Sequence, residues 1–119
     1  METGKQSLNK IQKTLSSSVR FVGVPQTLTV TNAALSLSEM VGYVAPPESA
    51  DYVLIEVQDA STGGIRFGFG TVGPTIAVGL RKFNKDTFDI ENPSDIQNFK
   101  AILGAVGVCY LNLQFGIKR

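Results

Sequence analysis

The chain of 119 residues carries a formal net charge of +1, no histidine, no tryptophan and a single cysteine, Cys109. This length suits one domain with its own core, and one cysteine excludes a framework of disulfides within the chain. Without histidine the commonest general base and metal ligand is missing, and the balanced charge argues against a surface dedicated to nucleic acid. No apolar run approaches the ~18 residues of a membrane span, and the first residues are polar. We therefore expect a soluble protein, made in the cytoplasm, that binds neither nucleic acid nor a membrane.

Residues 1–18 differ in composition from the rest of the chain. Their excess of positive charge comes from Lys5, Lys10 and Lys13. Three apolar residues recur at helical spacing, three and then four apart: Leu8, Ile11 and Leu15. A short amphipathic helix is one interpretation, although an isolated helix of this length is marginal in water. Two readings stay open: a disordered tail, or an arm that becomes ordered against a neighbouring subunit or another partner.

The two-residue alternation of β-strands begins with residues 19–24. Pro25 is expected to end this strand, because proline cannot donate a hydrogen bond to a neighbouring strand. Residues 26–32 and then 33–38 alternate again and predict two further strands. The pair at 46–47, both proline, closes this part of the chain with a rigid, extended turn.

The segment from residue 51 to residue 70 contains two more alternating runs, 52–58 and 65–70. Between them, residues 59–64 combine aspartate, serine and two glycines, which is the composition of a turn. We therefore predict a β-hairpin here, with a loop long enough to present something to a partner.

Alternation continues through residues 76–80, and a tight turn is expected at 84–87 before a strand at 88–90. The most regular strand of the chain is predicted at 108–117. Between these strands the period changes, and Ser94 and Gln97 have the spacing of a helical capping box. One short helix is therefore expected at 94–100.

These elements predict an all-β fold: an antiparallel, jelly-roll-like β-sandwich of eight or so strands with turns every ~8–12 residues, and one short helix. The N-terminal arm would be residues 1–18 and the sandwich domain residues 19–119. The residues expected to be mostly buried are Leu28, Val30, Val53, Ile55, Val57, Phe67, Ile90, Phe99, Leu111, Leu113 and Phe115.

Gly68, Gly70 and Gly73 have the spacing G-x-G-x-x-G, which in dinucleotide-binding proteins opens a helix whose N-terminus holds the pyrophosphate. Here Pro74 and β-branched residues follow, so no such helix and no nucleotide site are expected. The glycines are better explained by a close approach of another backbone, within the sheet or across a subunit contact.

Three acidic residues cluster in sequence: Asp86, Asp89 and Glu91. A paired-carboxylate hydrolase or a calcium site would use such residues, but the spaced pattern of a calcium loop is absent. A solvated strand face is the stronger interpretation.

Cys109 lies inside the last predicted strand and is expected to be a small buried apolar side chain, because a nucleophilic cysteine would want a histidine partner. Arg81, Lys82 and Lys85 form a small basic spot. A solubilising loop is its default explanation, and a phosphate or acidic partner is the alternative. The residues thus predict no enzymatic activity, no cofactor and no metal.

Four short runs resemble a small β-sandwich protein that is frequent in the structural gene clusters of tailed bacteriophages: Val57–Ala60, Ile65–Phe67, Gly73–Thr75 and Val78–Gly79. The resemblance covers about residues 27–117 and includes an acidic strand at 86–91, a helix at 94–101 and the closing strand around Leu111. The chain departs from that pattern in the glycines at 63–64 and at 70, and in its longer polar arm.

This resemblance implies a non-enzymatic component of the virion, and most directly a homo-oligomeric capsid decoration or cement protein bound to the major capsid protein or to other virion proteins. A head–tail, neck or tail-fibre adaptor is the alternative in the same class. A carbohydrate-binding module is the contrasting class. A surface tryptophan or several exposed tyrosines in the loops would favour this class, and the loops lack them. The candidate interface residues are Lys5, Leu8, Lys10, Ile11, Lys13, Leu15, Gly63, Gly64, Arg66, Gly68 and Gly70.

Overall fold

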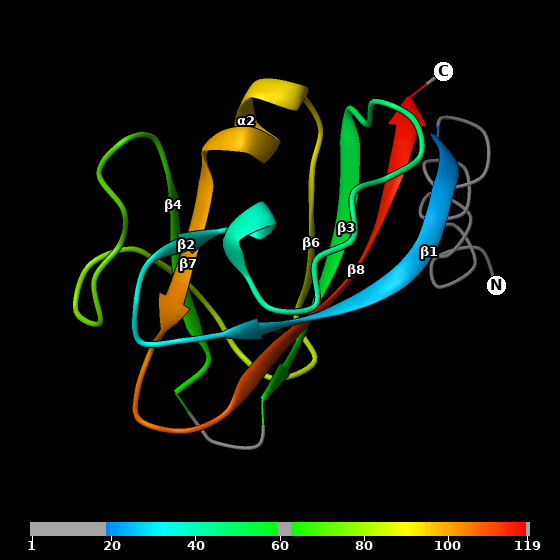
Figure 1. Cartoon of the computed structure of the whole chain (residues 1–119). Coiled ribbons are helices and arrows are strands. Elements are labelled where there is room, and N and C mark those ends of the chain that lie inside the picture. The colour runs from blue at the N-terminus through cyan, green and yellow to red at the C-terminus, as the bar shows by residue number, and fades with distance from the viewer. Residues whose placement is uncertain (1–18, 60–62, 119) are drawn as a thin grey trace, which may run out of the picture.

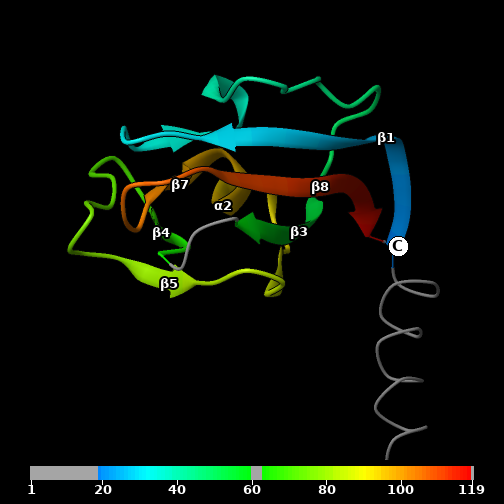
Figure 2. The ribbon, with the colours of Figure 1, turned by 90° about the horizontal axis from the view of Figure 1, so that it is seen from below.

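The computed structural model of the chain describes residues 19–59 and 63–118. Two antiparallel four-stranded sheets pack face to face (Figures 1 and 2), which confirms the predicted all-β sandwich. The strands are β1 (Val19–Val30), β2 (Leu35–Ser36), β3 (Tyr52–Asp59), β4 (Ile65–Phe69), β5 (Leu80–Lys82), β6 (Thr87–Ile90), β7 (Phe99–Leu103) and β8 (Cys109–Lys118). A 3-10 turn, η2 (Leu37–Glu39), follows β2, and the helix α2 (Pro93–Asn98) lies between β6 and β7.

The strand order is that of an eight-stranded jelly roll, with β1-β8-β3-β6 in the first sheet and β2-β7-β4-β5 in the second. Four antiparallel pairs, β1–β8, β2–β7, β3–β6 and β4–β5, correspond to one long hairpin whose two halves pair along the chain. Rolling that hairpin up adds the pairs β3–β8 and β4–β7. The turn of the long hairpin is therefore the link between β4 and β5.

The predicted hairpin over residues 51–70 is wrong. Its two strands, β3 and β4, have the expected alternation but lie in different sheets. β3 pairs with β8 and β6, while β4 pairs with β7 and β5. Alternation shows which face of a strand is buried but not which strand pairs with it.

β1 continues past Pro25, so the predicted end of a strand at this residue is also wrong. The pairing register with β8 shifts between Val22 and Gln26, and this irregularity accommodates the proline without breaking the strand. A later segment covers the outer edge of β1: the N–H of Thr29 donates to the carbonyl of Val41, and the Gln26 side chain binds the backbone of Val44.

Two other predicted strands differ at their boundaries. The strand expected at 33–38 is reduced to the two residues of β2, followed by η2. The run 76–80 is loop until Leu80, where β5 begins. The turn at 84–87, the strand at 88–90 and the strand at 108–117 are confirmed within one residue or so.

The helix is present but its cap is not the predicted one. Asn92 is the N-cap residue, and its side-chain oxygen accepts a hydrogen bond from the N–H of Asp95 at 2.8 Å. Pro93 occupies the first turn, where its missing N–H costs nothing. Helix α2 therefore starts one residue before Ser94, and it ends at Asn98 because Phe99 already belongs to β7.

The core fills the space between the two sheets, and all eleven residues predicted to be buried are buried. Aromatic rings join the layers: Phe88 of the first sheet stacks on Phe67 of the second, with 5.0 Å between ring centroids. Phe99 contacts both rings. The sequence pattern alone did not indicate that Tyr52, on the opposite face of β3, is also buried, with its hydroxyl donating to Asp89 at 2.9 Å.

Candidate functional site: the β4–β5 loop

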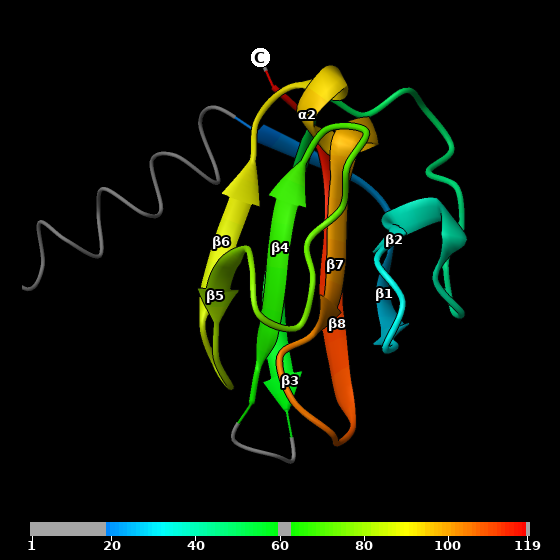
Figure 3. The same ribbon diagram turned by 90° about the vertical axis from the view of Figure 1, so that its left-hand side faces the viewer.

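The link between β4 and β5, residues 70–79, carries an unusual set of exposed apolar side chains. Figure 3 shows it running across the outer face of the second sheet, in front of β4 and β7. The exposed fractions are 87% for Val72, 55% for Ile76 and 67% for Val78, and Leu80 at the start of β5 is 60% exposed. Single exposed apolar residues are ordinary, but several on one loop make this loop a candidate contact surface.

Arg66 fixes the second half of this loop. Its side chain points outward from β4, and Nε donates to the carbonyl oxygen of Ile76 at 2.9 Å. Nη1 of the same guanidinium donates to the carbonyl oxygen of Gly79 at 3.0 Å. A planar guanidinium with two fixed acceptors holds the two positions at a set distance.

The first half of the loop is fixed by Lys100 of β7 and by close packing. Nζ of Lys100 donates to the carbonyl oxygen of Thr71 at 3.3 Å. Gly73 lies so close to Ala34 that an added Cβ would be 2.8 Å from the Cβ of Ala34, and the adjacent Pro74 is buried. The loop thus rests on the sheet on its inner side.

Thr75 closes the tip of the loop into a small turn. Its N–H donates to the carbonyl oxygen of Val78 at 2.8 Å, and its hydroxyl oxygen accepts from the N–H of Val78 at 3.0 Å. Gly79 follows with a φ of +142°, a conformation that favours glycine. The backbone is therefore set locally, and the apolar side chains around it are presented to solvent in one arrangement.

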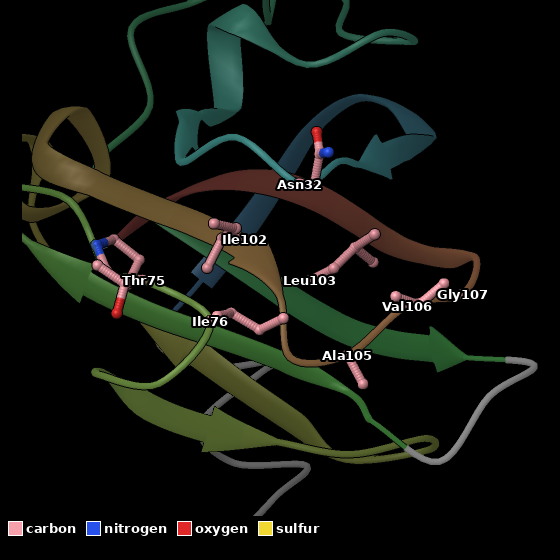
Figure 4. A pocket seen from close by; sticks show the side chains of 9 residues that line it. Asn32, Thr75, Ile76, Ile102, Leu103, Ala105, Val106 and Gly107 are labelled. Carbon is pink, nitrogen blue, oxygen red and sulfur yellow. The ribbon is translucent and has the colours of Figure 1, made fainter.

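Beside the loop lies an apolar pocket of about 480 Å³, here named the loop pocket. Ile76 enters it from the loop, Ile102 and Leu103 from β7, and Val106 from the β7–β8 link (Figure 4). Val106 is 96% exposed. None of the lining residues is charged: Asn32, Pro74, Thr75, Ile76, Ile102, Leu103, Ala105, Val106 and Gly107.

Three of the predicted interface residues belong to this region. Arg66 and Gly68 lie on the outward face of β4, and Gly70 begins the loop with its N–H donating to the carbonyl oxygen of Asn98. A Cβ added at Gly68 or Gly70 would meet nothing within 4 Å among residues 19–59 and 63–118, so the space on the side-chain side of both glycines is open there. Within the described residues, the sheet therefore gives no steric reason for glycine at these two positions, and a contact with another subunit stays a prediction.

Gly63 and Gly64 lie elsewhere, at the start of β4, and both are buried. A Cβ added at Gly64 would come within 2.1 Å of the carbonyl oxygen of Lys82, and one at Gly63 within 2.4 Å of Ala105. Packing within the fold thus requires glycine at both positions. The arm residues Lys5, Leu8, Lys10, Ile11, Lys13 and Leu15 lie outside the described residues.

Several of the other groups singled out in the sequence have partners within the fold. Asp86 accepts from the N–H of Phe83 at 2.7 Å, and Arg81 donates to the carbonyl oxygen of Gly63 at 2.6 Å. Cys109 is fully buried, and burial, with a smaller effect of the Asp59 carboxylate, raises the pKa of its thiol to about 12. Over residues 19–59 and 63–118, no three acidic, histidine or cysteine side chains group in a way that could hold a metal ion.

The sequence predicted a loop at 71–75 but a strand at 76–80, and so missed the exposure of the apolar residues in this second segment. Their alternation resembles that of a half-buried strand, and nothing in the pattern says that the same residues stay outside. Pro74 and Gly79 flank residues 75–78, and such residues are typical of the ends of a loop rather than of a strand. They were the sequence signal from which a loop could have been predicted.

Comparison of the chain with protein-family models, with curated proteins and with solved structures gives no significant match. In the part of the chain that the structure describes, no helix is long and apolar enough to cross a membrane.

Proposed function

We propose that this protein is a non-enzymatic structural component of a phage particle that decorates or cements the capsid shell by binding the major capsid protein. The observation that carries this proposal is the β4–β5 loop, whose apolar side chains are exposed while its backbone is held by Arg66 and Lys100. A surface that is already ordered loses little conformational entropy when a partner covers it. The surface of the β4–β5 loop is therefore suited to lasting contact with another protein.

The architecture and the sequence add independent support. Jelly rolls occur in viral capsid domains, although also in lectins, so the fold argues by analogy only. The resemblance of residues 27–117 to a phage structural protein points to the first of these two groups. The Gly73–Thr75 run of that resemblance lies in the β4–β5 loop, and the Ile65–Phe67 run contains Arg66, which holds this loop.

A carbohydrate-binding module fits this surface less well. A sugar needs several hydrogen-bond partners and an aromatic ring to stack on, whereas only Asn32 and Thr75 supply polar side chains to the loop pocket. An adaptor at the neck or tail would use the same apolar surface. The particle part to which the protein binds distinguishes an adaptor from a decoration protein.

The test is co-sedimentation of the purified protein with phage heads and, separately, with tails that lack it. Val72→Asp combined with Val78→Asp should weaken head binding at least about a hundredfold, because each buried valine contributes about 1.5–3 kcal/mol. Val24→Asp is the matched control: Val24 is 60% exposed and lies on β1 in the other sheet. Absence of binding to heads, or equal binding of all three proteins, would contradict the proposal, and binding to tails alone would favour the adaptor.

A further inference from the structure

We propose that the apolar stripe Leu8, Ile11 and Leu15 of one copy of the chain docks in the loop pocket of a second copy. This deepens the proposed function, on which it rests, by naming one partner of the β4–β5 surface. The partner is the chain itself, and the contact is made by unlike parts of the two copies.

The loop pocket has the chemistry for such an occupant. Its walls are the aliphatic side chains of Ile76, Ile102, Leu103 and Val106, with no charged group among the lining residues (Figure 4). A charged or strongly polar ligand would lose its hydration there without finding enough partners. A row of aliphatic side chains has no polar hydration to lose there, and it covers Ile76 and Val106, which are 55% and 96% exposed.

Residues 8–15, which precede β1 in the sequence, supply such a row. Leu8, Ile11 and Leu15 share one face when this stretch is helical, because residues three and four apart are neighbours on a helix. Lys10 and Lys13 then fall on the opposite side and stay in water. The stretch buries its apolar side only against another surface, because an isolated helix of this length is marginal.

If residues 8–18 are helical, they are too short to reach the loop pocket of their own copy. β1 pairs with β8 from Val19 opposite Lys118 to Val30 opposite Cys109, which spans roughly 30 Å. The pocket is lined by Asn32, just past the end of β1, and by residues 105–107 of the β7–β8 link. Figure 1 shows that this link lies at the other end of the sandwich from the start of β1. Leu8 is eleven residues before Val19, which in a helix is only about 17 Å. The neighbouring copy must therefore provide the pocket.

Because the arm and the pocket are different surfaces, the contact is head-to-tail. Each copy offers one arm and one pocket, so association continues until a ring closes or a chain of copies forms. This arrangement has a property that a face-to-face contact lacks: a copy with a damaged arm and a copy with a damaged pocket still form one good contact between them.

Sedimentation velocity on the full chain, without phage particles, uses this property. Ile11→Asp damages the arm and Val106→Asp damages the pocket, and each should sediment as a monomer where the wild type is oligomeric. An equimolar mixture of the two should give a one-to-one pair that grows no further. Asn9→Asp, off the stripe, and Val41→Asp, 74% exposed near β1, are the matched controls and should behave as the wild type.

Circular dichroism of the two variants checks that both remain folded, as expected from the exposure of Val106 and the position of Ile11 before β1. A wild-type chain that stays monomeric overturns the proposal. So does an Ile11→Asp chain that still associates while Val106→Asp does not, because the surface of a second copy, not its arm, would then fill the pocket. An equimolar mixture of Ile11→Asp and Val106→Asp that forms no one-to-one pair also overturns the proposal. None of these results depends on head binding, so each leaves the proposed function to its own test.

Discussion

Nε of Arg66 lies 2.9 Å from the carbonyl oxygen of Ile76, and this hydrogen bond joins the outer face of β4 to the tip of the loop above it. A second bond from the same guanidinium reaches Gly79. The side chain therefore sets the conformation of the exposed surface while contributing nothing to the core. Removing its donors should therefore loosen the loop without opening the core.

Arg66→Met keeps the apolar stem and removes both donors. We expect the free energy of unfolding in urea to fall by about 1–3 kcal/mol, since each bond contributes about 0.5–1.5 kcal/mol. Amide hydrogen exchange in residues 75–79 should become faster, and head binding should weaken. Arg20→Met is the control. The ion pair of Arg20 with Glu48 is exposed, so its loss should change neither stability, nor hydrogen exchange in the loop, nor head binding. Unchanged exchange in the loop would show that Lys100 and packing suffice.

A hydrogen bond between Asp59 and Gly64 joins the end of β3 in one sheet to the start of β4 in the other. The N–H of Gly64 donates to Oδ2 of Asp59 at 2.6 Å, and Asp59 is only 6% exposed. Asp59→Ala leaves a buried donor unpaired, so the free energy of unfolding should fall by about 1–3 kcal/mol. Glu91→Ala, at an exposed acid, should stay within about 0.5 kcal/mol of the wild type. Equal urea midpoints for the two variants would contradict this role.

The burial of side chains could be predicted from the sequence, but the pairing of strands could not. Val53, Ile55 and Val57 recur at every second position of β3, and a strand with such an apolar face must turn that face to the core whichever strand lies beside it. Alternation does not identify the partner strand: β3 pairs with β8, more than fifty residues later, instead of with β4. Local turn chemistry at 59–64 suits a hairpin and a crossing between sheets equally well.

The candidate surface was predictable only in part. Arg66 was singled out as an interface residue, and its place in the strand was expected from the alternation. Its partners, the carbonyl oxygens of Ile76 and Gly79, are backbone groups that carry no signal in the sequence. Nor can exposure of Val78 be deduced, because the same alternation is buried in one context and exposed in another.

Leu113 tests the assignment of the two faces of β8. It is 3% exposed, whereas the neighbouring Gln114 lies on the outer face. Leu113→Ala should lower the free energy of unfolding by about 2–5 kcal/mol, because it removes buried methyl groups and leaves a cavity. Gln114→Ala should have an effect of no more than about 1.5 kcal/mol, the most that its hydrogen bond to Gly23 contributes. Similar urea midpoints would mean that the faces are reversed.

Cys109 should make stability depend on pH in the alkaline range. The pKa of its thiol is raised to about 12 in the folded protein, whereas an unfolded thiol has a pKa of about 8.5. Below pH ~8.5 both states keep the proton, and the stabilisation is complete. Above it the unfolded state ionises first, so stability is lost as the pH rises toward 12, by at most about 1.4 kcal/mol per pH unit.

The measurement compares the wild type with Cys109→Ala in urea. The stability difference between them should shift against the wild type by about 2 kcal/mol between pH 7.5 and pH 10. At pH 8 a thiol reagent should modify Cys109 only in urea. Rapid modification of the folded protein would show that the thiol is accessible and that the expected pH dependence has no basis.

Deletion of residues 1–18 separates the arm from the sandwich. The core is formed by residues of the two sheets, and β1 begins at Val19, so the remaining chain closes its own core. We expect the thermal midpoint to shift by no more than roughly 2–4 °C. Head binding should weaken and should lose part of its dependence on salt, because Lys5, Lys10 and Lys13 are removed. Unfolding of the truncated chain would make the arm part of the core. Unchanged binding would leave the β4–β5 loop as the sole contact with the particle.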